Sequence, residues 1–133
     1  HFIGKLSNPR RNYNSKSFSA LHWIRKNQLN MFIYNVTVHV ESSVEGKWLD
    51  WMRDEHIPAV LNTGKFTQAK LFKVITDQDQ GGVSYATQYH CATSKEYEQY
   101  LSENAENLWQ EAQDRFGSSI LAFRTQLEEI LSL

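Results

Sequence analysis

The sequence predicts an α+β fold in which two helices cover one face of a four-stranded antiparallel sheet. Two observations lead to this fold class. Apolar side chains alternate with polar ones in several short segments, as in strands with one buried face, and two longer segments repeat apolar residues at helical spacing. These segments follow one another in the order strand, helix, strand, strand, helix, strand.

Four strands account for the alternating segments. The first is predicted over residues 31–41, where apolar and polar side chains alternate strictly. The second, over 65–76, is apolar on both faces, so we expect both faces to be covered. A polar segment with two glycines, 77–82, predicts a hairpin turn before the third strand over 83–91. The last strand is predicted over 118–131, with one side formed by Leu121, Phe123, Thr125 and Leu127.

Both helices have recognisable ends. Ser42 and Glu45 form a candidate capping box for the first helix, which should end near Pro58 because proline lacks the N–H that a continuing helix needs. Residues 59–62 can make one more short turn, which Gly64 is placed to stop. Thr93 and Glu96 form a second capping box. Gly117 is expected to end that helix, whose predicted buried stripe consists of Tyr97, Leu101, Ala105, Leu108, Ala112 and Phe116.

This element order is that of a ferredoxin-like βαββαβ sandwich, with the strands in the spatial order 4-1-3-2 and both helices on one face. The other sheet face then needs a cover, which could be solvent, a ligand or a second subunit. We expect that face to carry Asn35, Thr37, His39, Ala86, Gln88, His90, Ala122, Arg124 and Gln126.

Residues 1–30 differ in composition from the rest of the chain. They hold six basic side chains and no acidic one, whereas residues 31–133 hold 8 basic and 15 acidic side chains. We expect residues 1–30 to be a basic leader that is disordered or foreign to the native protein, with Met31 as the native start. A basic arm and a transit peptide are the alternatives. Residues 31–133 are predicted to form a single domain.

Charge and cysteine content argue against several classes of protein. The acidic balance of residues 31–133 argues against nucleic-acid binding, which requires clustered basic side chains. No run of about 18 apolar residues occurs, so no membrane-spanning helix is predicted. Cys91 is the single cysteine, which forbids an internal disulfide and fits a cytoplasmic location.

Five segments carry a family resemblance: IYNVTV (33–38), WLDWMRDEHIP (48–58), TGKF (63–66), RFG (115–117) and AFRTQLE (122–128). Together they resemble a family of small bacterial proteins described as a domain of unknown function. More broadly, the chain is similar to the dimeric α/β-barrel superfamily, in which two ferredoxin-like sheets pair face to face. This resemblance implies the fold and a homodimer. It implies no reaction, because the superfamily includes cofactor-free monooxygenases, isomerases, haem-degrading enzymes and proteins without known activity.

Glu55 and His56 are the candidate catalytic residues. On an ideal helix, Glu55 falls in the middle of an apolar stripe that includes Trp48 and Met52. An apolar site raises the pKa of a carboxyl group, and with an imidazole beside it such a group could act as a general acid or base. The alternative is that Glu55 pairs with Arg124 or a tyrosine hydroxyl, and that His56 marks the break in the helix.

The candidate ligand-binding residues are Trp48, Trp51 and Arg124. The two tryptophans are expected as walls of the core or of a pocket, whereas Arg124 could either clamp an anionic ligand or reach across a dimer seam. His39 and His90 lie at opposite ends of the predicted ladder between the first and third strands, too far apart to share a metal ion. We therefore expect no metal and no cofactor.

The sequence leaves three functions open. The leading hypothesis is a cytoplasmic homodimer that binds a small molecule in a pocket between helices and sheet. The first alternative is a cofactor-free enzyme, similar to a monooxygenase or isomerase, that uses Glu55 and His56 on a small substrate. The second alternative is a structural interaction module. Whether the protein is an enzyme at all is left open.

Overall fold

The computed structural model describes residues 31–77 and 81–133 of the chain; the predicted leader, 1–30, and part of the predicted hairpin turn, 78–80, lie outside the described residues. Four strands form one antiparallel sheet: β1 (Phe32–Glu41), β2 (Gln68–Lys73), β3 (Gly82–Cys91) and β4 (Ile120–Glu128). Their spatial order is β2-β3-β1-β4. This order confirms the predicted ferredoxin-like fold and its strand arrangement.

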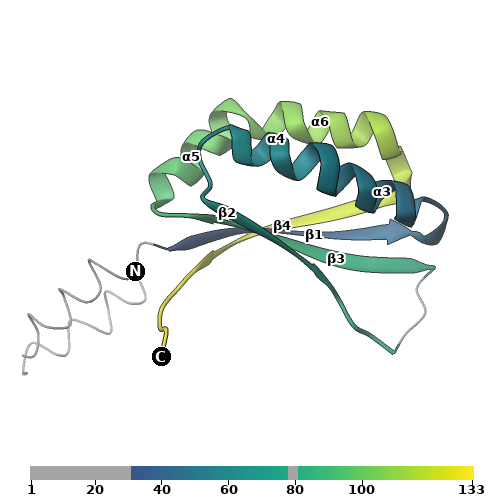
Figure 1. Ribbon diagram of the computed structural model, residues 1–133, viewed down its shortest axis with the longest axis horizontal. Coiled ribbons are helices and arrows are strands. Elements are labelled where there is room, and N and C mark those ends of the chain that lie inside the picture. The colour runs from purple at the N-terminus through teal and green to yellow at the C-terminus, as the bar shows by residue number, and fades with distance from the viewer. Residues whose placement is uncertain (1–30, 78–80) are drawn as a thin grey trace, which may run out of the picture.

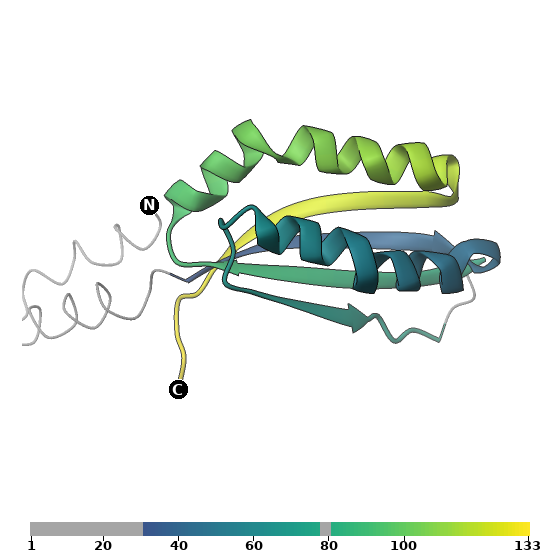
Figure 2. The same cartoon turned by 45° about the horizontal axis from the view of Figure 1, so that its top comes forward.

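The helices all lie on one face of the sheet and leave the other face uncovered (Figure 1). After a short 3₁₀ turn at Ser42–Val44 come α3 (Glu45–Trp51), a π-helical segment (Met52–His56) and α4 (Ile57–Asn62), which continue one another. The second helical layer consists of α5 (Ser94–Glu103) and α6 (Ala105–Phe116), followed by a 3₁₀ turn at Gly117–Ser119. Figure 2 shows the angle between α5 and α6.

The core lies between this sheet face and the helices. Tyr34, Val38 and Val40 of β1 point into it, as the alternation in residues 31–41 predicts. Two buried clusters fill the space, one around Trp48 and Trp51 and the other around aromatic residues. The second cluster contains Tyr34, Phe66, Tyr89 and Tyr100. No helix in the described part of the chain is long and apolar enough to cross a membrane.

The two predicted capping boxes differ in outcome. The box at Thr93 is confirmed, because the N–H of Thr93 donates a hydrogen bond to Glu96 Oε1 at 3.0 Å. The box at Ser42 is wrong, since no side chain caps the 3₁₀ turn or α3. Glu45 instead accepts a hydrogen bond from the hydroxyl of Tyr85, at 2.5 Å. This tertiary contact takes the carboxylate that the capping box would have needed.

The second helical stripe is also corrected. Asn104, with φ −127° and ψ −33°, interrupts the predicted single helix and separates α5 from α6. The break changes which side of α5 faces the core, so Tyr100 is buried at 3 % exposure whereas Leu101 is 39 % exposed. Gly117 does end α6, and it does so with the positive φ of 52° that glycine tolerates best.

The largest correction concerns which way β4 faces. Arg124 lies directly opposite Val36 of β1, and residues opposite one another in an antiparallel pair share a face. Arg124 therefore points toward the helices, together with Ala122 and Gln126, and not onto the open face as expected. The open face instead receives the apolar side of β4, which leaves Leu121, Phe123 and Leu127 exposed at 59 %, 61 % and 42 %.

Candidate ligand pocket between the helices and the sheet

The pocket depends on a π-helical turn in the middle of the first helical layer. Within Met52–His56 the hydrogen bonding widens, and the N–H of Ile57 donates to the carbonyl of Met52, five residues earlier. Pro58 follows at once, yet the helix continues to Asn62. The predicted break at Pro58 is therefore wrong, whereas the further helical turn predicted over residues 59–62 is present. The wide turn supplies the local adjustment that lets a proline, which lacks an N–H, sit within the helical run.

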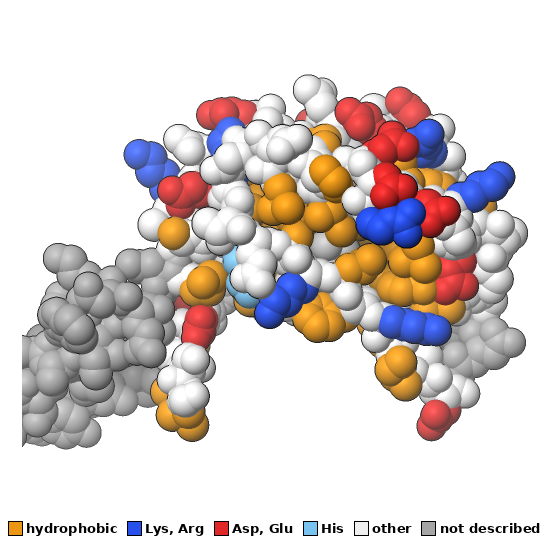
Figure 3. All heavy atoms as spheres, in the orientation of Figure 1, with side chains coloured by type: hydrophobic (Ala, Val, Ile, Leu, Met, Phe, Trp, Pro, Cys, Tyr) orange, Lys and Arg blue, Asp and Glu red, His pale blue; other side chains and the backbone are white. Residues whose placement is uncertain are grey.

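The π turn holds one residue more than an α-helical turn, and this rotates the residues that follow it. Glu55 is consequently placed on the outer surface, where its side chain is 61 % exposed and lies 3.2 Å from Arg115 Nη1. The predicted place of Glu55 in the apolar stripe is thus wrong. Figure 3 shows the acidic and basic side chains that gather on this outer surface of the helices; those around Glu55 include Lys47, Asp50, Asp54 and Arg115.

His56 takes the inward position that an ideal helix would give to Glu55. Its ring stacks on Trp51 with centroids 4.6 Å apart and 27° between the planes. Burial lowers the pKa of His56 to about 4, so the imidazole is neutral at pH 7. Its Nδ1 atom is buried and has no hydrogen-bond partner among the described residues. The structure therefore separates the two predicted catalytic residues, and a catalytic role for either stays a prediction.

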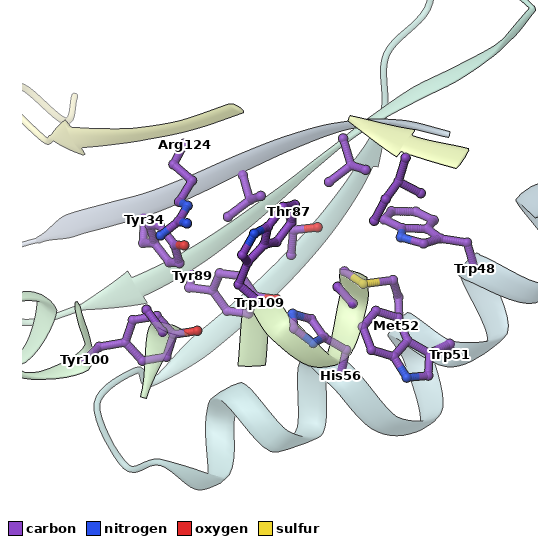
Figure 4. A pocket seen from close by; sticks show the side chains of 15 residues that line it. Tyr34, Trp48, Trp51, Met52, His56, Thr87, Tyr89, Tyr100, Trp109 and Arg124 are labelled. Atoms are coloured by element: carbon purple, nitrogen blue, oxygen red, sulfur yellow. The ribbon is translucent and has the colours of Figure 1, made fainter. Parts of the chain in front are cut away.

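A cavity of about 40 Å³ lies between the π turn, α6 and the sheet. Its walls are mostly aromatic and apolar and include Trp48, Trp51, Met52, Tyr89, Tyr100 and Trp109. Thr87 of β3 also lines the cavity; it is only 1 % exposed, and its Oγ1 has no hydrogen-bond partner in the described part of the chain. Figure 4 shows the labelled side chains converging on this space from the sheet and from the helices.

Arg124 supplies the positive charge of the site. Its guanidinium carbon lies 5.8 Å from the ring centroid of Trp109, within the range of a cation–π contact. Burial raises the pKa of the hydroxyls of Tyr34 and Tyr100, and the nearby guanidinium of Arg124 opposes that shift in both. Arg124 forms no salt bridge with any carboxylate in residues 31–77 and 81–133. Arg124 does hydrogen-bond the side chain of Tyr34, which brings no negative charge to the guanidinium.

The structure brings together the three residues predicted to bind a ligand, since Trp48, Trp51 and Arg124 all line the cavity. Their binding role stays a prediction. Sequence reasoning missed Thr87, although a hydroxyl in the middle of the apolar face of the third predicted strand is a usable signal. Among the described residues, no group of three or more His, Cys, Asp or Glu side chains could hold a metal ion.

The sheet, the helical layer and the enclosed cavity define a ferredoxin-like α+β protein with an internal pocket. A family model described as Domain of unknown function (DUF4286) matches residues 31–130, and the chain belongs to this family. A comparison with curated proteins finds no match.

Two solved structures share the fold at low sequence identity. One is a dimeric ferredoxin-like protein from an uncultured marine organism, 9 % identical, with a TM-score of 0.55 over 77 % of this chain and 98 % of the other. The second is an EthD-family protein from Bacillus halodurans C-125, also 9 % identical, with a TM-score of 0.58 over 74 % of this chain and 99 % of the other. At such identity the likeness concerns the fold alone.

Proposed function

We propose that this protein is a homodimer whose subunits each bind a small molecule in the cavity between the helices and the sheet. The observation that carries the proposal is the pair of buried polar atoms, Thr87 Oγ1 and His56 Nδ1, that line one cavity without a partner in the described chain. A buried polar atom left without a hydrogen bond costs about 1–3 kcal/mol. Two such atoms at one cavity are what a binding site needs before its ligand arrives.

The open face of the sheet supports the second half of the proposal. It carries five large apolar side chains that are each at least 40 % exposed: Phe72, Val74, Leu121, Phe123 and Leu127. These side chains lie along the two edges of the face, on β2 and its extension and on β4, and the central strands between them carry mostly polar residues. Exposed apolar side chains at this density mark an interaction surface. A second copy of the chain, related by a two-fold axis, would bury the same patch on both subunits. One of the proteins with the same fold is itself described as dimeric.

A thermal-shift screen against a metabolite library tests ligand binding. A compound that binds only the native state raises its stability by RT ln(1 + [L]/Kd). The screen compares the wild type with Ala112→Val, which adds two methyl groups to a buried residue of the cavity wall. Ala92→Val, at an exposed position, is the matched control.

We expect compounds that raise the Tm of the wild type and of the Ala92 variant but not that of the Ala112 variant. If no compound does so, or if every stabilising compound acts equally on all three proteins, the cavity is not a binding site. Circular dichroism of each variant establishes that it is folded.

A cofactor-free enzyme is the second candidate, and the π turn favours it. Such turns occur frequently at functional sites, and this one places a neutral imidazole at the cavity. His56 could accept a proton from a bound substrate, whereas Glu55 is on the outer surface and cannot share the same space. Conversion of an identified ligand by the wild type but not by His56→Gln would separate the enzyme from a binding protein.

A further inference from the structure

We propose that the pocket takes a short-chain monocarboxylic acid that also carries an uncharged hydroxyl or carbonyl group. The carboxylate would lie at Arg124, and the uncharged group would lie inside the cavity against Thr87 and His56. This inference rests on the proposed binding function and adds the class of ligand. It is carried by the arrangement of charge, hydrogen-bonding atoms and space across the sheet.

A row of residues across three strands sets the length of the site. Thr87 of β3 and Arg124 of β4 are both paired with Val36 of β1, so all three lie in one row on the helix-covered face. Two strand spacings separate the ends of the row, which is about 10 Å between backbones. Because the long side chain of Arg124 covers part of this distance, a ligand that touches both ends needs only a short chain.

The Arg124 end of the row is suited to a carboxylate. Arg124 is exposed, its guanidinium has no carboxylate partner in the described residues, and the group lies over the ring of Trp109. Its planar fork of N–H donors matches the two oxygens of a carboxylate. The nearby side chains of Tyr34 and Tyr100 bring hydroxyl groups and no negative charge.

The other end of the row accepts a polar group only if that group is uncharged. Thr87 Oγ1 can donate and accept a hydrogen bond, and a neutral imidazole nitrogen can do one or the other. The neighbouring walls, which include Trp51 and Met52, are apolar, and the cavity lining contains no cation other than Arg124 and the titratable His56. A second carboxylate there would be buried without a counter-charge, which strongly disfavours binding.

The volume of the cavity limits the chain length. At about 10–15 Å³ per water molecule, 40 Å³ holds about three waters. That space suits a few carbon atoms and one polar group, whereas an aromatic ring occupies cavities of about 150 Å³. With the carboxylate at the exposed side chain of Arg124 and the rest of the ligand in the remaining space, the ligand class narrows to acids of about three to five carbons.

Four four-carbon probes test each part of the inference. 3-Hydroxybutyrate has the carboxylate and the hydroxyl, butyrate lacks the hydroxyl, 1,3-butanediol lacks the carboxylate, and succinate adds a second charge. Each probe is titrated into the full chain while ¹H–¹⁵N NMR follows the indole N–H signals. Three of the four tryptophans, Trp48, Trp51 and Trp109, line the cavity and serve as reporters.

We expect 3-hydroxybutyrate to shift these indole signals with a dissociation constant about tenfold below those of the other three probes. The diol loses a hydrogen bond to a charged group, butyrate leaves a buried hydroxyl unsatisfied, and succinate buries an unpaired charge. Arg124→Gln should weaken 3-hydroxybutyrate binding to the level of the diol. Arg115→Gln, which removes an exposed arginine outside the cavity lining, is the matched control and should bind normally.

Equal binding of the diol and the hydroxy acid would overturn the carboxylate assignment, and equal or tighter binding of succinate would overturn the uncharged inner end. Absence of binding by all four probes would overturn the ligand class. These outcomes test only the ligand class. The proposed binding function is tested separately, by whether the metabolite screen finds a ligand that the Ala112 variant no longer binds.

Discussion

At the scale of single residues, the character of the site depends on His56 facing inward. A neutral imidazole stacked on Trp51 offers the cavity a hydrogen-bonding atom without a charge. Glu55, one residue earlier, has the opposite environment, in solvent beside Arg115. Two neighbouring residues thus lie on two faces of one helical run, and His56 lines the cavity whereas Glu55 does not.

His56 should make stability depend on pH. Its pKa is about 6.5 in the unfolded chain and about 4 in the folded one, so the unfolded state binds the extra proton between these values. Stability should therefore fall as the pH drops from 6.5 to 4, by up to about 3 kcal/mol from this residue alone. Urea denaturation at several pH values should show a smaller fall for His56→Gln than for the wild type. Parallel curves would show that the imidazole is not buried.

Glu55→Gln should change the free energy of unfolding by less than about 1 kcal/mol. The carboxylate and its partner Arg115 have side chains that are 61 % and 49 % exposed, and exposed ion pairs contribute little. Arg115→Gln should have an equally small effect. Chemical denaturation of both variants measures this, and a loss of several kcal/mol on removing the carboxylate would contradict the exposed position of Glu55.

At the scale of elements, the π turn is the feature that builds the site. It lets Trp48, Trp51 and Met52 on one side of the turn, and His56 and Val60 on the other, share a face of one continuous helical run. A regular α-helix through the same sequence would have turned Glu55 to the middle of the core-facing stripe and placed His56 about 100° from it, at the edge of that stripe. The extra residue of the π turn therefore places the imidazole of His56 at the cavity, and not the carboxylate of Glu55.

Deleting Asp54 should be tolerated far better than deleting Asp50. Both side chains are exposed, but removal of Asp54 takes out the extra residue of the π turn and leaves the inward residues in phase. Removal of Asp50 from α3 rotates Trp51 and Met52 away from the core. We expect a folded protein, destabilised by roughly 3 kcal/mol through Pro58, from the first deletion, and no cooperative unfolding from the second. Thermal unfolding followed by circular dichroism measures both deletion variants. Equal Tm values would contradict the interpretation that the π turn holds one extra residue.

Local signals allowed much of the fold to be predicted, and tertiary contacts decided the rest. The alternation in β1, the capping box at Thr93 and the glycine at 117 each act within a few residues, so they are legible in the sequence. The π turn is different, because helical periodicity assumes a constant rotation per residue. Of the site, the sequence predicts Trp48 and Trp51 as walls of the core or of a pocket. It predicts Arg124 on the wrong face of the sheet, and it predicts Glu55 in the inward position that His56 takes.

At the scale of the whole molecule, the two outer surfaces are unlike. The helical surface carries charged side chains (Figure 3), whereas the open sheet face carries exposed apolar ones. This contrast explains why the alternation in residues 118–131 predicts the wrong sheet face for the apolar side of β4. Alternation shows which residues share a face, but a strand with an apolar side does not reveal whether that side meets its own helices or a partner. Arg124 faces the helices and the apolar side of β4 faces outward, and this arrangement is an argument that a partner covers the open sheet face.

Phe123→Glu should convert the proposed homodimer into a folded monomer. The side chain is 61 % exposed in the single chain, so the change costs the monomer little, but a carboxylate within the apolar patch opposes pairing of two sheets. Leu101→Glu, at an exposed position on α5, is the control and should stay dimeric. Light scattering at micromolar concentration measures both, and a monomeric wild type would contradict the proposed assembly.

The central claim is that Thr87 keeps a buried hydroxyl for a ligand and not for the fold. The most direct measurement is the free energy of unfolding of Thr87→Val without ligand, because valine keeps the shape and removes the unpartnered oxygen. We expect the free energy of unfolding of Thr87→Val to exceed that of the wild type by about 1–2 kcal/mol. Thr63→Val, which loses a hydroxyl that donates to the carbonyl of Val60 at 2.7 Å, should instead lose stability. A loss of more than about 1 kcal/mol in Thr87→Val would show that the hydroxyl serves the fold, and would contradict the claim.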